Sequence, residues 1–444
     1  MTRFSRRSFL AGSAAMAASA RPTAAFGQST DVDVAIVGAG AAGIAAARRL
    51  IAAKRRVVVL EASERVGGRC VTDTQSFGVP FDRGAHWIHA PDFNPLAKLA
   101  PSTGLDIYHA PQGQKLRIGR RNAREGELED FLANMVRANR AISEAARGKT
   151  DISCAQALPN DLADWRPPID FVLGPFGCAK NLEDVSAFDF AKSAERDVDA
   201  FCRQGFGALL AKLGDGVPVR LANPVTRIDT QARSGVEIES AKGRLRARHV
   251  IVTASTAILA SGRIKFAPDL PKRHLDAAVK LSLGSYDHIA IEFEGNALGL
   301  QSDELVFEKS GARNTAAILA NVSRSSLCLV EVGGSFGKSL AAQGERAMVA
   351  FAADWLAGLF GNDIKKAVKR TLATQWNKEP WTLGAFSAAA VGGQPGRRVL
   401  MEPVRERVWF AGEAAHETLW GTVGGAWESG ERAAEAVLKR LQKG

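Results

Sequence analysis

An α/β fold that opens with a strand, a tight turn and a helix is predicted by three features of the sequence. Residues 33–37 form a short β-branched, apolar run that leads directly into the glycine-rich stretch 38–43. Residues 44–50 continue as an alanine-rich helical pattern, and a second apolar run over 56–60 ends in Glu61. Strand, helix and strand in this order are typical of a parallel sheet with helices packed on its faces.

The composition is that of a folded protein with more than one domain. The 444 residues are 46% hydrophobic and 24% charged, which excludes a disordered or collagen-like chain. At about 150 residues per domain, the length predicts two or three domains. The net charge of +11 is spread without a basic stripe, so we expect no nucleic-acid partner. The five cysteines form no C-x-x-C pair, which argues against a disulfide framework and against a metal site.

The N-terminus has the pattern of an export signal. Arg6 and Arg7 precede an apolar, alanine-rich run that reaches Ala20, and small residues follow at 23–25. A charged start, a short apolar segment and a small-residue cleavage site predict a signal peptide over residues 1–25. The paired arginines resemble the twin-arginine type, which implies a periplasmic protein. The apolar run is too short to span a membrane, and no other stretch is long enough.

The glycine-rich stretch has the G-x-G-x-x-G spacing of a dinucleotide site. Gly38 permits the tight turn, Gly40 lets the backbone approach a pyrophosphate, and Gly43 allows the helix to pack closely on the strand. Glu61, at the end of the second strand, is placed to accept hydrogen bonds from a ribose. A second glycine-rich stretch, 333–339, lacks the spacing of a phosphate loop, and we interpret it as a turn.

Further motifs at both ends of the chain carry a family resemblance. They are ASERVGGR over 62–69, FDRGAHWIH over 81–89, VWFAGE over 408–413, GTVGGA over 421–426 and SGERAA over 429–434. Together they resemble the flavin-containing amine oxidase family, which includes monoamine oxidases, polyamine oxidases and lysine-specific histone demethylases. The resemblance implies bound FAD and oxidation of an amine C–N bond. Hydride would pass from the α-carbon to flavin N5, and water would hydrolyse the resulting imine to a carbonyl product.

The motifs and the resemblance together give a set of cofactor residues. They are Gly38, Gly40, Ala42, Gly43, Glu61, Ala62, Arg65, Gly68, Arg69, Gly84, Ala85, His86, Trp87, Val225, Thr253, Gly412, Glu413, Thr422 and Val423. Arg65 and Arg69 would offer donors to phosphate or flavin oxygens, and Glu413 would accept from a ribityl hydroxyl. A helix that begins near Val423 would direct its N-terminus at the flavin.

The resemblance also implies a reacting centre. The family pattern G-x-[FYW]-S falls on 384–387, so Phe386 forms one wall in front of the flavin and Thr422 the facing one. Trp420 and Trp381 would supply an aromatic face for an ammonium group. His288 stands where the family has a lysine that holds a water at flavin N5, and an offset of one residue would place Asp287 there instead, with Lys280 a further candidate. Ala385 stands where monoamine oxidases attach the flavin to cysteine, which implies non-covalent FAD.

Because cofactor motifs lie at both ends and in the middle, the flavin domain must be discontinuous. We expect a Rossmann-like FAD-binding domain over 31–96, 205–262 and 395–444, with strands at 218–221, 236–240 and 249–253. An interleaved α+β substrate domain would cover 97–204 and 263–394. It would combine a mixed sheet, with strands at 286–293 and 327–332, and a helical cap. The cap would contain a helix over 128–146 and breaks at Pro159 and at Pro167-Pro168.

Two other functions remain open at this stage. One is a flavin-dependent desaturase or oxidase of a C–C bond, because such enzymes share the N-terminal fingerprint. The other is a catalytically silent exported flavoprotein with a binding role, which the replacement of lysine by His288 favours. For the amine reading, we expect a primary, secondary or cyclic amine as substrate. Oxygen or a cytochrome c-type carrier would accept the electrons, and the sequence carries no signal for an oligomeric state.

Overall fold

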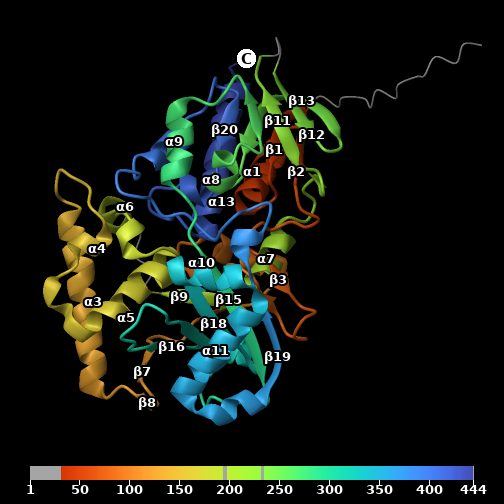
Figure 1. The fold of residues 1–444 in the computed structure, drawn as a ribbon. Coiled ribbons are helices and arrows are strands. Elements are labelled where there is room, and N and C mark those ends of the chain that lie inside the picture. The colour runs from red at the N-terminus through yellow and green to blue at the C-terminus, as the bar shows by residue number, and fades with distance from the viewer. Residues whose placement is uncertain (1–31, 194–197, 232–234, 444) are drawn as a thin grey trace, which may run out of the picture.

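The computed structural model describes residues 32–193, 198–231 and 235–443, so the expected signal peptide over 1–25 lies outside the described residues. The chain forms two large sheets, one in the upper half and one in the lower half of Figure 1. Helices from both ends of the chain cover the first sheet, and helices from its middle cover the second. Within the described residues, no helix is both long and apolar enough to cross a membrane.

The first sheet has eight strands and contains the predicted opening unit. Its order is β10-β2-β1-β13-β12-β11-β14, and β20 pairs with β13. The strands are β1 (Val32–Val37), β2 (Val57–Leu60), β10 (Val219–Arg220), β11 (Val225–Asp229), β12 (Val236–Ser240), β13 (Gly243–Val252), β14 (Lys265–Ala267) and β20 (Val408–Phe410). β1 pairs in parallel with both β2 and β13, so the motif-bearing ends of these three strands lie at one edge.

Two helices from opposite ends of the sequence cover one face of this sheet. They are α1 (Ala41–Ala52) and α13 (Val423–Leu441), which pack together over Val34 and Ile36 of β1. The contact is close because Gly430 of α13 faces α1, and a Cβ there would lie 2.1 Å from the Ala42 carbonyl oxygen. The opposite face packs against α8 (Thr256–Ala260) and α9 (Lys272–Lys280), and α9 contacts α12 (Gly396–Met401).

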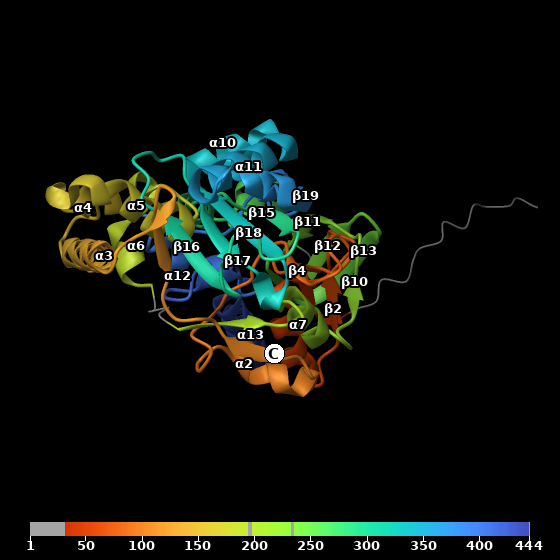
Figure 2. The same cartoon turned by 90° about the horizontal axis from the view of Figure 1, so that it is seen from below.

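The second sheet has seven strands in the order β19-β15-β18-β17-β16-β7-β8. They are β7 (Lys115–Ile118), β8 (Arg121–Asn122), β15 (Tyr286–Phe293), β16 (Glu304–Glu308), β17 (Ala317–Ala320), β18 (Leu327–Gly333) and β19 (Val368–Ala373). One face is covered by α10 (Gly334–Gln343) and α11 (Glu345–Phe360), as Figure 2 shows. The prediction of strands at 286–293 and 327–332 is confirmed.

A group of helices flanks the second sheet and forms the expected cap. It comprises α3 (Glu125–Ala145), α4 (Cys154–Ala157), α5 (Arg166–Phe171) and α6 (Ala187–Ala191), all on the left of Figure 1. The expected break at Pro167-Pro168 is wrong, because the pair lies in the first turn of α5. Proline fits there because the first helical N–H groups have no intrahelical partner.

Smaller elements join the two halves. A two-stranded sheet pairs β3 (Thr72–Asp73) with β4 (Phe81–Asp82). A three-stranded sheet has the order β5-β9-β6, formed by β5 (Ile88–His89), β6 (Ile107–His109) and β9 (Asp199–Cys202). The remaining α-helices are α2 (Pro95–Leu99) and α7 (Phe206–Leu213).

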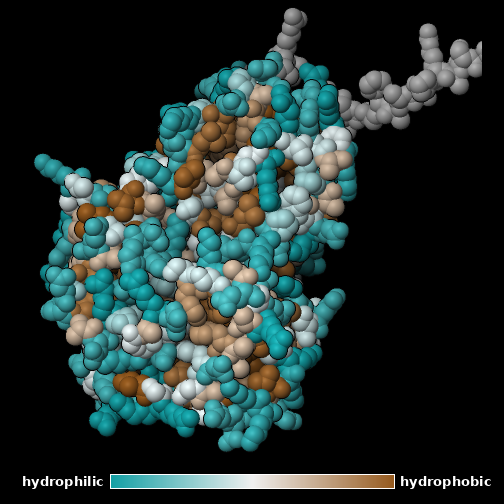
Figure 3. Space-filling view, in the orientation of Figure 1, coloured by the Kyte–Doolittle hydropathy of each residue, from teal (hydrophilic) through white to brown (hydrophobic). Residues whose placement is uncertain are grey.

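Two other sequence expectations need correction. The stretch 333–339 is not a turn, because α10 begins at Gly334 and buries Leu340 and Ala341. β14 pairs with β11 of the first sheet, although the expected division assigned residues 263–394 to the substrate domain. The first sheet therefore continues past the expected boundary at residue 262. The face shown in Figure 3 is mostly hydrophilic, with apolar patches in its upper part and smaller ones near its lower edge.

Candidate functional site

One large cavity collects almost all of the predicted site residues. Its volume is about 1150 Å³, slightly above the range of roughly 300–1,000 Å³ that is usual for small-molecule sites. It runs from the glycine-rich turn after β1 to side chains of β15, β16 and the cap helix α3. Every predicted cofactor residue lines it except Gly43, and so do all five residues predicted for the reacting centre.

The glycine-rich turn has the geometry that a pyrophosphate cradle requires. Gly38 has φ +103°, a conformation that favours glycine, and its neighbour Thr253 donates to the Val37 carbonyl. A Cβ on Gly40 would meet nothing closer than the Gly67–Gly68 backbone at 4.0 Å, so this backbone is open to a ligand. A Cβ on Gly43 would lie 1.9 Å from the Gly38 carbonyl oxygen, so Gly43 packs the helix against the turn. The residues present fit a dinucleotide.

Glu61 is held in place from two sides at the end of β2. It is 7% exposed, and one carboxylate oxygen accepts from the Ala39 N–H at 2.6 Å. The other oxygen accepts from the N–H and the hydroxyl of Ser63, both at 2.8 Å. These bonds fix the carboxylate at the cavity wall, next to the turn that Gly38 begins. The oxygen that accepts from Ala39 has a second lone pair, which can accept from a ribose hydroxyl.

Two residues that were expected to contact the cofactor separately are bound to each other. Arg69 donates from one nitrogen to Glu413 at 2.9 Å and to the Ala385 carbonyl at 2.5 Å. Glu413 also accepts from the Ser387 hydroxyl at 2.6 Å and from the Gly421 N–H at 2.9 Å. Burial alone would raise the pKa of Glu413, but the charge of Arg69 and the bond from Ser387 outweigh it and hold the pKa below its usual range. The pair therefore connects the motif around Gly68 with the wall at residues 385–387.

Phe386 and Thr422 both line the cavity. A Cβ on Gly421 would lie 2.9 Å from the Phe386 ring, so this glycine lets the ring pack against the chain just before Thr422. The Thr422 hydroxyl accepts from the Gly425 N–H and donates to the Leu419 carbonyl, which caps α13. The cap places the start of α13 at Val423, as expected.

The two tryptophans predicted for an aromatic face lie in different surroundings. Trp420 is 2% exposed, and the Arg397 guanidinium stacks on its ring at 4.9 Å. Trp381 is 41% exposed, and its neighbours in the chain accept hydrogen bonds from Arg263 and from Ser255 near α8. Trp381 therefore borders the cavity beside the first sheet.

Several aromatic residues that line the cavity were not predicted, among them Tyr286 and Trp376. Tyr286 has its ring 6.0 Å from that of Phe386 and 5.8 Å from that of His288. Trp376 is 6% exposed, and its indole N–H donates to the Arg83 carbonyl at 2.8 Å. The strand pattern of 286–293 places Tyr286 and His288 on one face, which was an available signal for Tyr286. Trp376 follows β19 and carried no local signal.

His288 and its two alternatives, Asp287 and Lys280, differ in whether they line the cavity. His288 lines the cavity, whereas Asp287 does not line it and accepts from Thr374 and from the Trp376 N–H. Lys280 also lies away from the cavity and donates to the Gly392 carbonyl. Burial lowers the pKa of His288 to about 4. The imidazole at this position is therefore uncharged at neutral pH, unlike a lysine.

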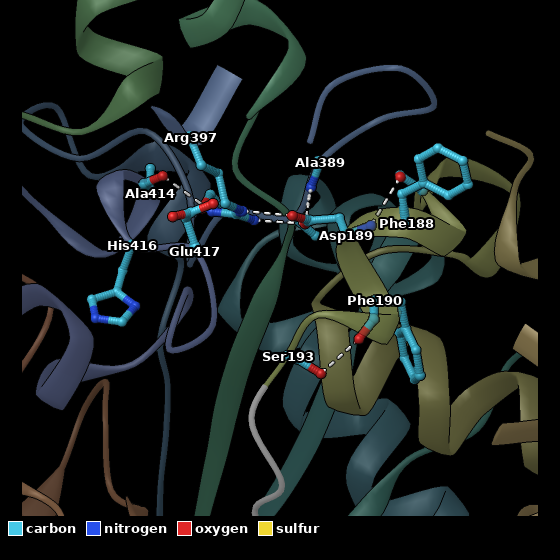
Figure 4. A network of polar contacts seen from close by, with 12 residues as sticks. Phe188, Asp189, Phe190, Ser193, Ala389, Arg397, Ala414, His416 and Glu417 are labelled. Atoms are coloured by element: carbon cyan, nitrogen blue, oxygen red, sulfur yellow. Dashed lines mark hydrogen bonds and ion pairs between the residues drawn. The ribbon is translucent and has the colours of Figure 1, made fainter. Parts of the chain in front are cut away.

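A buried ion pair ties the cap to this wall, as Figure 4 shows. Asp189 of α6 and Arg397 of α12 are both fully buried and make two hydrogen bonds of 2.6 and 2.7 Å. Arg397 also donates to the Ser387 hydroxyl at 3.3 Å and to the Ala414 carbonyl at 3.2 Å. Ser387 is the residue after Phe386, so Arg397 holds the side chain next to the aromatic residue, and Asp189 accepts from the Ala389 N–H two residues further on.

The described part of the chain contains no group of three or more His, Cys, Asp or Glu side chains that could hold a metal ion. All five cysteines are buried thiols. Burial raises the pKa of Cys202 to about 11 and that of Cys328 to about 12, so neither thiol is ionised near neutral pH.

Comparison with known proteins gives one family match and many relatives. A family model described as flavin containing amine oxidoreductase matches residues 41–438. Lysine-specific histone demethylase 2 of Homo sapiens is 26% identical over 442 residues, which cover 91% of this chain and 53% of that protein. Polyamine oxidase 4 of Oryza sativa subsp. japonica is 26% identical over 448 residues, covering 93% and 90%. The chain thus spans about half the length of the demethylase and most of the polyamine oxidase.

Solved structures share the fold at low sequence identity. Putrescine oxidase bound to putrescine has a TM-score of 0.78 at 21% identity, over 92% of this chain and 99% of that one. Cyclohexylamine oxidase from Brevibacterium oxydans has a TM-score of 0.79 at 22% identity, over 93% and 100%. These similarities, together with the two mixed α/β layers, confirm the predicted fold class.

Proposed function

The chain belongs to the family of flavin-containing amine oxidoreductases, and on this premise we propose that it binds FAD non-covalently and oxidises the C–N bond of a small amine. One observation carries the proposal. A single cavity joins an open glycine-rich cradle at the end of β1 to an aromatic wall at Phe386 and Tyr286. Bound FAD would take hydride from the carbon next to the amine nitrogen, and water would hydrolyse the imine to a carbonyl product.

The chain's own residues would orient the substrate and exclude water. Phe386 and Tyr286 bring two rings to one end of the cavity, and Phe176 adds a third at 6.1 Å from Tyr286. Such faces attract an ammonium group and pack against the carbon skeleton of an amine. The names polyamine oxidase, putrescine oxidase and cyclohexylamine oxidase say that these similar proteins oxidise amines. This supports a primary, secondary or cyclic amine as the substrate here.

The decisive experiment follows the colour of the bound flavin. Purified protein is mixed without oxygen with a panel of amines and amino acids, and flavin bleaching is recorded. An amine that bleaches the flavin supports the proposal, and reoxidation by oxygen or by cytochrome c then identifies the electron acceptor. Bleaching by compounds that lose hydrogen only from a C–C bond would support a desaturase. If no compound bleaches the flavin, the protein is a silent flavoprotein and the proposal is wrong.

Non-covalent attachment is supported by the residue at the expected linkage position. Ala385 lines the cavity, and an alanine side chain cannot form a thioether with the flavin. We therefore expect acid denaturation to release all of the FAD into the supernatant. Absorbance of the supernatant and of the precipitate measures this, and yellow colour that stays with the precipitated polypeptide would contradict it.

Glu61→Ala is expected to weaken FAD retention, because it removes the acceptor for the ribose and the bonds to Ala39 and Ser63. We expect about a tenfold loss of affinity, the effect of one hydrogen bond to a charged group. Glu64→Ala is the matched control, since Glu64 is exposed three residues away and does not line the cavity. Fluorescence titration of the apoprotein with FAD measures both, and equal affinity of Glu61→Ala and wild type would remove the ribose assignment.

We also propose that the protein is exported to the periplasm through the twin-arginine pathway. The support is the sequence of residues 1–25, with Arg6 and Arg7 before the apolar run. Replacing both arginines with lysine should leave a folded precursor in the cytoplasm, because the pathway reads the arginine pair whereas general secretion needs only positive charge. Fractionation and immunoblotting measure this. Full periplasmic accumulation of the Lys-Lys variant would refute the twin-arginine assignment.

A further inference from the structure

A buried carboxylate that the sequence did not single out lies behind the His288 wall of the cavity. Glu331 sits in β18 directly opposite His288 of β15 in the antiparallel register. Its side chain is fully buried, and neither carboxylate oxygen has a hydrogen-bond partner. An ionised carboxylate that is buried without a hydrogen bond is disfavoured, so the burial of Glu331 favours a bound proton.

The hydrogen bond of His288 to Asp82 determines which of its two nitrogens carries the proton. Nδ1 lies 3.0 Å from the Asp82 carbonyl oxygen, which can only accept, so Nδ1 carries a proton. In the neutral imidazole Nε2 is then bare, and it lies 3.5 Å from Glu331 Oε1. Nε2 and Oε1 are both acceptors when neither carries a proton. A proton on either atom makes the contact between them attractive.

The other groups that face the pair come from β15, from β4 and from the loop that follows β4. Tyr286 of β15 and Trp87 lie beside the carboxyl group and favour its charged form, without hydrogen-bond geometry. His86, whose Nδ1 is 2.9 Å from an Asp82 carboxylate oxygen, acts on both members of the pair through its charge. Asp82 also accepts from the Phe206 and Gly207 N–H groups.

Burial shifts the pKa values of the two partners in opposite directions. Burial raises the pKa of Glu331 to about 7, although His86, Tyr286 and Trp87 oppose the shift. Burial lowers the pKa of His288 to about 4. Near neutral pH the shared proton therefore lies on the carboxyl group, and it can be gained or lost there with little cost.

We propose that Glu331 and His288 form a single proton acceptor for the amine substrate, with His288 at the cavity and Glu331 acting through it as a positioning residue. The inference rests on the proposed amine oxidation. The substrate arrives as an ammonium ion, whose nitrogen must lose a proton before its lone pair can assist hydride loss. An ammonium N–H bond breaks and an N–H bond forms at the bare Nε2 of His288, from which the proton can pass to Glu331 Oε1. The charge of the pair changes from −1 to 0, that of the substrate from +1 to 0, and no electrons are transferred.

The first experiment measures flavin reduction without oxygen at pH values on both sides of neutrality, using an amine from the panel. The wild-type rate should rise with pH through an inflection near 7, as the pair loses its proton. Glu331→Gln should lose this inflection and reduce the flavin about a hundredfold more slowly, the scale of general base catalysis. Glu331→Asp should keep the inflection. Glu292→Gln is the matched control, because Glu292 lies on β15 and pairs with Arg370 at the surface.

The second experiment needs no turnover. Infrared spectra of the resting protein should show a protonated carboxyl band at neutral pH that disappears as the pH is raised. This band should be absent from Glu331→Gln and present in Glu292→Gln. A wild-type pH profile retained in Glu331→Gln, or no such band in wild type, would overturn the inference. If no amine bleaches the flavin but the band titrates, the proposed amine oxidation is wrong, and the proton-acceptor role of the pair is wrong too. The shared proton between Glu331 and His288 would still be confirmed.

Discussion

Asp189→Ala is expected to lower the free energy of unfolding by about 3–5 kcal/mol, the usual cost of removing one partner of a buried ion pair. Arg397 would keep its charge in a site where both side chains are fully buried, with only neutral groups such as the Ser387 hydroxyl left to accept from it. Asp189 also accepts from the Ala389 N–H at 2.9 Å, so the change leaves this donor unpaired as well. Chemical denaturation followed by circular dichroism measures the loss.

A double variant separates the charge from the packing. Asp189→Leu combined with Arg397→Met removes both charges and keeps most of the volume, so it should be more stable than either single variant. Arg398→Ala is the surface control, because Arg398 is the next residue of α12 and its side chain is 71% exposed in its pair with Glu417. This change should cost less than about 1 kcal/mol. A double variant as unstable as Asp189→Ala would show that the buried charge is not the cause.

The same variant should alter the aromatic wall. Arg397 donates to Ser387, which follows Phe386 and also donates to Glu413. Loss of Asp189 frees Arg397 to move, so the wall should lose its fixed position even where the protein remains folded. We therefore expect slower flavin reduction in Asp189→Ala at temperatures well below its unfolding transition, with the flavin still bound.

The start of the fold was predictable because its signals are local. The strand at 33–37, the glycine spacing and the helical pattern after it lie within twenty residues, and β1 and α1 follow them closely. The strands expected at 236–240 and 286–293 have those bounds in β12 and β15. In each case apolar and β-branched residues recur at the spacing that the element itself requires.

The errors arose where packing outweighs local preference. The glycines at 333–339 suggested a turn, yet α10 forms there because its Leu340 and Ala341 bury against the second sheet. Only Gly334, at φ +64°, keeps a conformation typical of a turn. The first sheet also extends past the expected boundary at residue 262. It does so because β14 pairs with β11, and this pairing is not visible in the local sequence.

Part of the site could not be predicted, because its residues come together only through contacts between distant segments of the chain. The glycine turn and Glu61 could be placed from their spacing, and the wall around Phe386 came from the family resemblance. Glu331 lies opposite His288 only because of a strand register that joins positions 43 residues apart, taking 331 − 288. Arg397 follows a Pro-Gly pair, which is typical of an exposed loop, and its burial depends on Asp189, 208 residues away. The roles of the predicted site residues remain predictions.

Gly43→Ala is expected to abolish FAD retention and to destabilise the protein by about 3 kcal/mol or more. The added Cβ would lie 1.9 Å from the Gly38 carbonyl oxygen, which is backbone and cannot rotate away. Relief requires α1 to move off the turn, and that movement would open the cradle formed with Gly40. Gel filtration with flavin absorbance measures retention, and chemical denaturation of the apoprotein measures stability without the cofactor.

Gly358→Ala is the matched control for this prediction, because the same methyl group is added to a helix where nothing lies within 4 Å. Gly358 is exposed in α11, far along the chain from the cavity residues of β1 and α1. Alanine favours the helix by up to about 1 kcal/mol over glycine, so this variant should be as stable as wild type or slightly more so, with FAD bound. Retention of FAD by Gly43→Ala at wild-type stability would mean that α1 can shift without disturbing the turn, and the close packing of Gly43 would then have no role in holding the cofactor.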